Sequence, residues 1–91
     1  FTNRAFKMKK VKMYCTSTCP FCTAAENLLS TKNITNFEKI NIENSPELKD
    51  EMIKITGRHT VPQIFIDDFH VGGCDDLYLL EKDEKLDQLL T

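Results

Sequence analysis

The sequence predicts a single α/β domain in which helices flank a four-stranded mixed sheet. Its 91 residues are enough for one domain. Segments of strand-like alternation and of helical periodicity follow one another in the order β-α-β-α-β-β-α. The last two strands are separated only by Asp67-Asp68, which predicts an antiparallel hairpin. Hydrophobic residues make up 41% and charged residues 29% of the chain, which is ordinary for a folded globular protein.

The first half of the domain reads as strand, helix, strand. Residues 10–14 alternate apolar and polar side chains, as expected of a strand. A polar loop follows, and Pro20 suits the first turn of a helix because its missing N–H would have no partner there. That helix should end near residues 32–33. Residues 37–42 alternate again and predict the second strand.

The middle of the chain carries a complete set of helix signals. Residues 45–47, Ser-Pro-Glu, combine a cap residue, a proline for the first position and an acid for the positive end of the helix. Gly57 is placed to end this helix in a left-handed conformation. Four apolar residues are expected to form its buried stripe: Leu48, Met52, Ile53 and Ile55.

The C-terminal part predicts the hairpin and the closing helices. Residues 63–66 and 69–71 are rich in β-branched and aromatic side chains and should be strands. Two glycines precede a helix over residues 74–81, and leucines near residue 90 indicate a short last helix. Strands joined through a helix should be parallel and the hairpin strands antiparallel. The whole arrangement is thioredoxin-like.

Charge and hydropathy exclude several functional classes. The net charge is -2, so the chain as a whole does not attract nucleic acid or an anionic membrane. Five basic residues precede the first acid, Glu26, but no interleaved aromatics or DNA-binding motif accompany them, and they fit a solvated terminus. They are Arg4, Lys7, Lys9, Lys10 and Lys12.

The N-terminal residues stand apart from the domain. No run approaches the roughly 18 apolar residues that span a bilayer, and no apolar segment follows the basic residues as it would in a secretory signal. Met8 is a candidate for the natural start. We therefore interpret residues 1–8 as an extension or a segment of artificial origin, and residues 9–91 as the domain.

The four cysteines do not look like a structural disulfide framework. Three of them, Cys15, Cys19 and Cys22, fall within eight residues, too close to join distant parts of a fold, and Cys74 stands alone. With no export signal, we expect a reducing compartment, the cytoplasm. The thiols should then be catalytic, metal-binding or packed.

Cys19-Pro20-Phe21-Cys22 is a C-x-x-C sequence between a predicted strand and a predicted helix. The first cysteine meets unpaired N–H groups at the helix start, which favour the thiolate that acts in disulfide exchange. We therefore expect Cys19 to attack and Cys22 to resolve. The alternatives are half of a zinc site or two buried apolar residues. A zinc site needs four ligands, and no second C-x-x-C or H-x₃₋₅-H is present.

A rival interpretation adds Cys15 to the pair. Cys15, Cys19 and Cys22 form C-x₃-C-x₂-C, a spacing found in enzymes that cleave S-adenosylmethionine with a [4Fe–4S] cluster. A chain this short cannot build the barrel of those enzymes, although a small cluster scaffold stays open. Pro20 argues against it by stiffening the loop. We expect no metal and no tightly bound cofactor, and we interpret Cys15 as a packing thiol.

Three blocks of sequence together resemble the glutaredoxin family, and in particular its small bacterial dithiol members. They are residues 19–22 (CPFC), 58–66 (RHTVPQIFI) and 72–77 (GGCDDL), and the likeness runs in the same order from about residue 10 to residue 90. Thioredoxins and metal sites also contain C-x-x-C, and it is the combination with T-V-P and G-G-C-D-D at these separations that makes the resemblance specific. The resemblance implies a monomeric oxidoreductase that uses glutathione as electron donor to reduce protein disulfides and glutathione mixed disulfides.

The resemblance also implies a site. A cis peptide bond before Pro62 should expose the backbone of Val61 beside Cys19, where an extended substrate can pair with it. Asp75 and Asp76 should hold the γ-glutamyl end of glutathione at a helix start, with Arg58 a candidate partner for the glycyl carboxylate. The implied glutathione residues are Arg58, Thr60, Val61, Pro62, Gly73, Cys74, Asp75 and Asp76.

Two positions depart from the family pattern. Many glutaredoxins have a lysine or arginine where this chain has Thr16, and a tyrosine where it has Phe21. His59 is expected to be a bystander and His70 to lie on the hairpin surface. A thioredoxin-like carrier reduced by a flavoprotein reductase, a metal scaffold and a structural adaptor are the competing functions. The adaptor leaves the cysteine pair unexplained.

Overall fold

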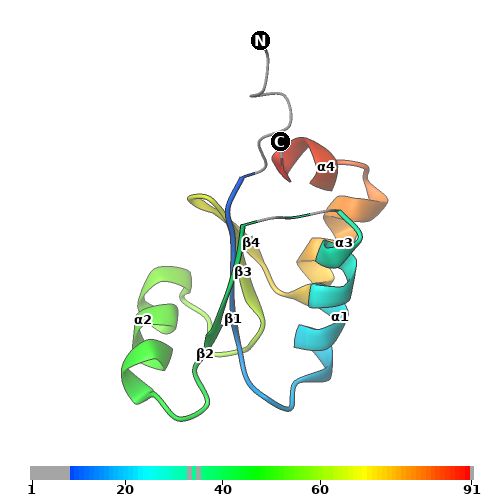
Figure 1. Ribbon diagram of the computed structural model, residues 1–91. Helices are drawn as coiled ribbons and strands as arrows, with labels where there is room; N and C mark the ends of the chain where they lie inside the picture. Colours follow the sequence, from blue (N-terminus) through cyan, green and yellow to red (C-terminus); the bar gives the residue numbers. More distant parts are fainter. Residues whose placement is uncertain (1–8, 33, 35, 91) are drawn as a thin grey trace.

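Four strands form one sheet in the order β2-β1-β3-β4, and helices cover both of its faces (Figure 1). The computed structural model describes residues 9–32, 34 and 36–90. Figure 1 shows α2 on one side of the sheet and α1 and α3 on the other, with α4 close to the first strand's start. The elements are β1 (Val11–Cys15), α1 (Pro20–Ser30), β2 (Phe37–Asn41), α2 (Pro46–Thr56), β3 (Gln63–Ile66), β4 (Phe69–Gly72), α3 (Cys74–Lys82) and α4 (Leu86–Leu90).

The predicted order of elements and the α/β class with a mixed sheet are confirmed. Most boundaries agree within one or two residues. The first helix ends at Ser30, slightly earlier than expected, with Thr31 as its cap. Asn33, at the predicted helix end, and residues 1–8 lie outside the described residues. In the described part of the chain, no helix is long and apolar enough to cross a membrane.

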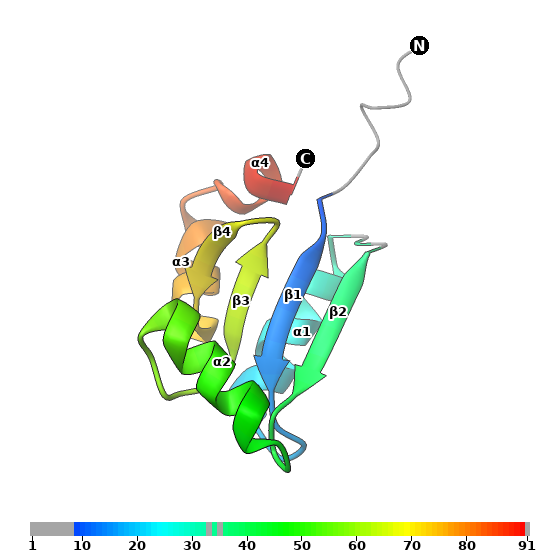
Figure 2. The same cartoon turned by 90° about the vertical axis from the view of Figure 1, so that its left-hand side faces the viewer.

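The direction of β3 corrects one expectation. β1 and β2 are parallel as predicted, but β3 is antiparallel to β1, although α2 joins it to β2. Asn41 at the end of β2 lies beside Cys15, and Gln63 at the start of β3 lies beside Tyr14. Because Asn41 and Gln63 both lie beside the end of β1, the chain re-enters the sheet at the same end of the strands at which it left, and β3 must run the opposite way. Figure 2 shows the β3–β4 hairpin at one side of the sheet and β2 at the other.

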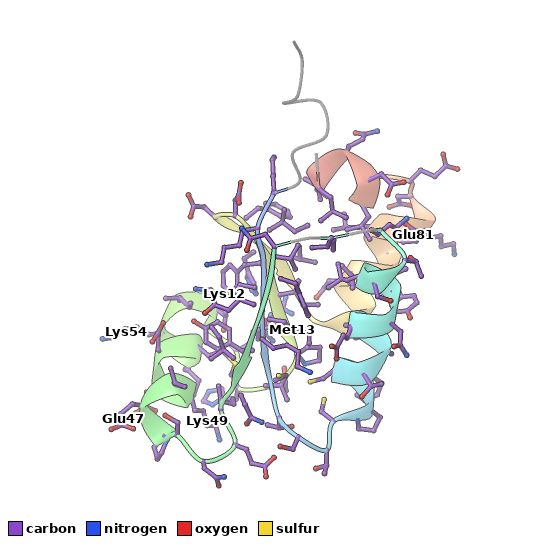
Figure 3. The ribbon with its side chains drawn as sticks, in the orientation of Figure 1. Lys12, Met13, Glu47, Lys49, Lys54 and Glu81 are labelled. Carbon is purple, nitrogen blue, oxygen red and sulfur yellow. The ribbon has the colours of Figure 1, made fainter. Side chains whose placement is uncertain are left out.

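Alternation along β1 separates two hydrophobic clusters. Val11 and Met13 belong to the larger cluster, under α1, α3 and α4. Tyr14 belongs to the smaller cluster, with Met52 of α2 and Phe65 of β3. Figure 3 shows Lys12 and Met13, neighbours in β1, on opposite faces of the sheet. This is the period-two pattern of a strand buried on both sides.

The buried face of α2 is narrower than the sequence suggested. Met52 is fully buried, and Leu48 and Ile53 pack partly against the smaller cluster. Ile55, expected in the same stripe, is 50% exposed. A helix that packs on one face of a sheet buries only the side that it turns to the sheet. In α2 this side is centred on Met52, and Ile55, in the last turn, lies at its margin. Figure 3 shows Glu47 and Lys54 of α2 on the side of the helix that faces away from the sheet.

Local signals for helix ends and turns are confirmed. Ser45 caps α2 by accepting the Leu48 N–H at 3.3 Å, and Gly57 ends it with φ 72°. Asp67 of the hairpin turn also has positive φ, 52°, which Asp tolerates better than most residues. The bond between Val61 and Pro62 is cis, as the resemblance implied.

Candidate active site

Cys19 is the N-cap residue of α1. Its backbone is extended, and its Sγ accepts the N–H of Cys22 at 3.1 Å. The sulfur thus occupies the position where the oxygen of a serine or aspartate normally caps a helix. The sequence Cys-Pro at the start of α1 therefore places a partly exposed sulfur at the N-terminal end of the helix, the end that favours negative charge.

Cys22 lies one turn into α1 and is 4% exposed. Burial, reinforced by the hydrogen bond to Cys19, raises the pKa of Cys22 to about 12. At neutral pH its thiol is therefore protonated and shielded from solvent. The two cysteines of the pair differ sharply in accessibility, although only two residues separate them.

The start of α1 forms one wall of the site, and the loop before β3 forms a second. The carbonyl oxygen of Val61 lies 3.9 Å from Cys19 Sγ, within reach of its S–H. Val61 precedes the cis peptide bond to Pro62. The loop that leads into β3 therefore also brings main-chain hydrogen-bonding groups to the Cys19 sulfur.

The start of α3 forms the third wall. The Asp76 carboxylate accepts the Gly73 N–H at 3.0 Å and pairs with Arg58 Nη1 at 3.0 Å. These contacts, the Gly73 N–H first and Arg58 second, lower the pKa of Asp76. Gly72, with φ 114°, leaves room for the carboxylate, because a Cβ there would collide with it. From the sequence, Asp76 was expected at the γ-glutamyl end of glutathione and Arg58 at its glycyl carboxylate, and the contact between them was not predicted.

Phe21 of α1, the loop before β3 and the start of α3 together line a groove of about 320 Å³ beside the cysteine pair. All eight residues that the sequence assigned to glutathione line it, together with Phe21. Phe21 is 63% exposed and was not among the expected binding residues. Its position between the two cysteines was the available signal. The lining residues are Phe21, Arg58, Thr60, Val61, Pro62, Gly73, Cys74, Asp75 and Asp76.

The other two thiols are buried. Cys15 is packed in the core under α1, and burial raises its pKa. Cys74, in the first turn of α3, is also buried, and burial followed by the nearby Asp75 raises its pKa. Thr16 faces a separate hollow of about 370 Å³ that Cys15 and Cys22 also line. Among residues 9–32, 34 and 36–90, no three His, Cys, Asp or Glu side chains converge as a metal site would require.

Comparison with known proteins identifies many related sequences and folds. The family model described as Glutaredoxin matches residues 11–71. "Glutaredoxin 3" of Escherichia coli (strain K12) is 49% identical over 83 residues, which are 91% of this chain and 99% of the relative. The solution structure of a glutaredoxin from Brucella melitensis matches with a TM-score of 0.80 and 49% identity, covering 91% of this chain and 89% of that one. A buckwheat glutaredoxin–glutathione complex shares the fold, with a TM-score of 0.81 and 24% identity over 90% of this chain and 76% of that one.

Proposed function

This chain belongs to the glutaredoxin family and is a glutathione-dependent dithiol disulfide reductase, and from that premise we propose the roles of its site residues. Cys19 is the nucleophile, Cys22 is the resolving thiol, and the groove beside Val61 and Asp76 holds glutathione. One observation carries the assignment: a single groove gathers all the residues that the sequence assigned to glutathione, and its Val61 wall lies 3.9 Å from Cys19 Sγ.

In reduction of a glutathione mixed disulfide, Cys19 acts alone. Its thiolate attacks the glutathione sulfur, the substrate leaves as a thiolate that takes a proton from solvent, and Cys19 becomes disulfide-linked to glutathione. The thiolate of a second glutathione then attacks the sulfur of the bound one. Glutathione disulfide is released and Cys19 is regenerated as thiolate.

In reduction of a protein disulfide, the second thiol is needed. Cys19 attacks one sulfur of the substrate and forms a mixed disulfide with it. Cys22 loses its proton to solvent and its thiolate attacks Cys19 Sγ, so that the Cys19–substrate bond breaks, the substrate sulfur of that bond, the second to be released, leaves as a thiolate that takes a proton from solvent, and a Cys19–Cys22 disulfide forms. Two glutathione molecules then restore both thiols and become glutathione disulfide. Burial and the raised pKa of Cys22 leave Cys19 as the thiol that meets the substrate first.

The groove supplies contacts suited to an extended tripeptide. The backbone of Val61 pairs with the glutathione main chain as an added strand would. At the start of α3, free N–H groups suit the γ-glutamyl carboxylate and Asp76 suits its ammonium. Arg58 supplies a cation for the glycyl carboxylate of glutathione. Its ion pair with Asp76 places one positive and one negative side chain next to each other in the groove. The buckwheat relative, whose complex holds glutathione, shares this fold.

The remaining features of the proposal concern the whole protein. Its partners are glutathione, disulfide-containing proteins and glutathionylated proteins, and it uses no resident cofactor. It works as a monomer in the cytoplasm, and residues 9–91 form the glutaredoxin domain, with residues 1–8 outside it. Nucleic acids and membranes are not among its partners.

Serine substitutions test the two cysteine roles. Cys19→Ser should abolish reduction of both a small glutathione mixed disulfide and a protein disulfide, because no nucleophile remains. Cys22→Ser should keep the first activity and lose most of the second, measured in glutathione-coupled assays. Cys15→Ser, which also removes a buried thiol, is the matched control and should stay within a few-fold of the parent. Full activity in Cys19→Ser would overturn the assignment.

A further inference from the structure

Gln63 is an unusual residue for its position. In the described part of the chain, cysteines and Tyr14 aside, it is the one buried polar side chain, with 0% exposure. It is the first residue of β3 and directly follows the cis peptide bond to Pro62. A buried amide is costly unless its hydrogen bonds are satisfied. The hydrogen-bond partners of the Gln63 side chain therefore indicate what a buried glutamine contributes at this position.

The Gln63 amide joins the active-site loop to the hairpin. Its Nε2 donates to the carbonyl oxygen of Thr60 at 3.0 Å and lies 3.4 Å from Thr60 Oγ1. Its Oε1 lies 2.8 Å from Nε2 of His70 in β4. Because a carbonyl can only accept, Thr60 fixes which end of the amide is the nitrogen. The oxygen then faces His70, whose Nε2 must carry the proton and donate.

His70 is held in place by a second contact. Its ring stacks on Phe65 with 4.9 Å between centroids and 29° between planes, and it is half-buried instead of lying on the hairpin surface as expected. His70 and Phe65 are paired across β3 and β4. Burial first, and the nearby Arg58 second, lower the pKa of His70, while Asp76 opposes this. The neutral form of the ring is thus favoured near neutral pH, and the contact with Gln63 places the proton of that form on Nε2.

The chain of contacts ends at the reactive sulfur. Thr60 and Val61 are adjacent in the loop and both line the groove. The Val61 carbonyl lies 3.9 Å from Cys19 Sγ. A shift of the Thr60 carbonyl would move the neighbouring main-chain groups of Val61, which are those proposed to pair with glutathione. Gln63 therefore connects the β3–β4 hairpin to the loop that is proposed to bind glutathione.

We propose that Gln63 and His70 are positioning residues that hold the Thr60–Val61 backbone in register for the glutathionyl group. Neither residue touches the reacting sulfurs. They set how well the substrate is held, and leave the intrinsic reactivity of Cys19 unchanged. This inference rests on the proposed glutathione groove, so its test must separate the two.

The test uses the full chain with a glutathione–cysteamine mixed disulfide. Gln63→Met removes both amide contacts at similar volume, and His70→Phe keeps the stacking but removes the donor. Gln63→Met should raise KM about ten-fold and His70→Phe several-fold, with kcat within about two-fold, since each lost hydrogen bond is worth roughly up to a ten-fold change. The double variant should be no worse than Gln63→Met, because coupled residues are non-additive.

Two further measurements distinguish a positioning role from a general loss of structure. Alkylation of Cys19 by iodoacetamide should keep its rate in all three variants, and the backbone NMR shifts of Thr60 and Val61 should differ in them from those of the parent. Phe69→Leu, on the same strand but with an exposed side chain, is the control and should change neither. If Gln63→Met does not fold, His70→Phe carries the test, because it leaves the buried amide in place.

Asp76→Asn distinguishes the possible failures. If Asp76→Asn raises KM while Gln63→Met and His70→Phe lower only the free energy of unfolding, the positioning role is overturned and the groove stands. If KM is unchanged in all of these variants, the proposed groove is itself wrong and the inference falls with it. Strictly additive effects of Gln63→Met and His70→Phe would also overturn the inference.

Discussion

At the scale of single residues, accessibility separates the four chemically similar thiols. Cys15, Cys22 and Cys74 are buried, and burial is the first cause that raises the pKa of each. Cys19 is the one partly exposed thiol, with its sulfur facing the N-terminus of α1. The spacing of the cysteines in the sequence identifies the Cys19–Cys22 pair. Packing then leaves Cys19 partly exposed and buries Cys22.

Alkylation should reveal this difference directly. Treated briefly with iodoacetamide near neutral pH, the reduced protein should take up one equivalent, at Cys19, because the other thiols are protonated and shielded. Peptide mass spectrometry locates the label. Cys15→Ser should leave both the amount and the rate unchanged. Comparable labelling of Cys22 in the folded protein would contradict the proposed division of roles.

Charge reversal at Arg58 tests the groove at the same scale. Arg58→Glu should raise the apparent KM for glutathione several-fold, since an exposed ion pair is worth about 0.2–1 kcal/mol and the new carboxylate would face Asp76. Arg58→Gln is the control for charge removal without reversal and should have a smaller effect. The rate of Cys19 alkylation should not change in either variant.

Thr16→Lys tests whether a cation at the family's basic position helps. It should lower the KM for glutathione, and added salt should shrink the benefit by screening. Steady-state assays at low and high ionic strength measure this. Thr16→Gln, similar in length but uncharged, is the control. A salt-independent improvement would show that charge is not the cause.

At the scale of elements, the ends of the helices organise the site. The N-cap of α1 is Cys19, whose sulfur accepts a backbone N–H, and the N-cap of α3 is Gly73, whose N–H binds Asp76. The C-cap of α2 is Gly57 in the left-handed conformation, from which the loop 57–62 leads to the start of β3. Helix termini thus position all three walls of the groove.

Replacement of Gly57 should show how much this turn contributes to stability. Gly57→Ala should lower the free energy of unfolding by about 1–2 kcal/mol, because an L-residue is strained at positive φ. No atom lies within 4 Å of the added Cβ, so the cost is conformational and not steric. Urea unfolding measures it. Gly57→Asn should be milder, since Asn tolerates this conformation, and equal stability of Gly57→Ala and the parent would contradict the argument.

At the scale of the whole molecule, the sheet separates two hydrophobic clusters, and polar contacts around the site make folding depend on pH. Asp76 has a lowered pKa through the Gly73 N–H and Arg58, and His70 has a lowered pKa through burial. In both cases the unfolded chain binds a proton more readily than the folded one. Stability therefore rises with pH across each interval.

The two groups should act in different pH intervals. Stability from Asp76 is present above its ordinary pKa of 3.8 and is lost as pH falls through the lower folded value. The His70 contribution declines as pH falls below 6.5 towards its folded pKa. Urea unfolding from pH 3 to 7 gives the free energy of unfolding as a function of pH. This free energy should depend less on pH at the acid end in Asp76→Asn, and less on pH just below 6.5 in His70→Phe. Unchanged slopes would contradict both assignments.

Much of this protein follows from short stretches of its sequence. The cap at Ser45, the left-handed Gly57 and the two-residue turn at Asp67 were predicted, because each depends on a few neighbouring residues. The C-x-x-C pair at the start of α1 was predicted for the same reason. Local propensity and period are thus enough to give the order of the elements and the reacting pair.

Contacts between distant residues were decided only by the tertiary structure. The antiparallel course of β3, the Arg58–Asp76 pair and the Gln63–His70 contact all join segments whose sequence pattern says nothing of the other. The exposure of Ile55 likewise depends on how α2 lies over the sheet. Periodicity shows which face of an element is apolar, but neighbours in space are chosen by loop paths and packing. The sequence alone therefore determined the reactive cysteines and the family, whereas packing determined how the groove around them is built.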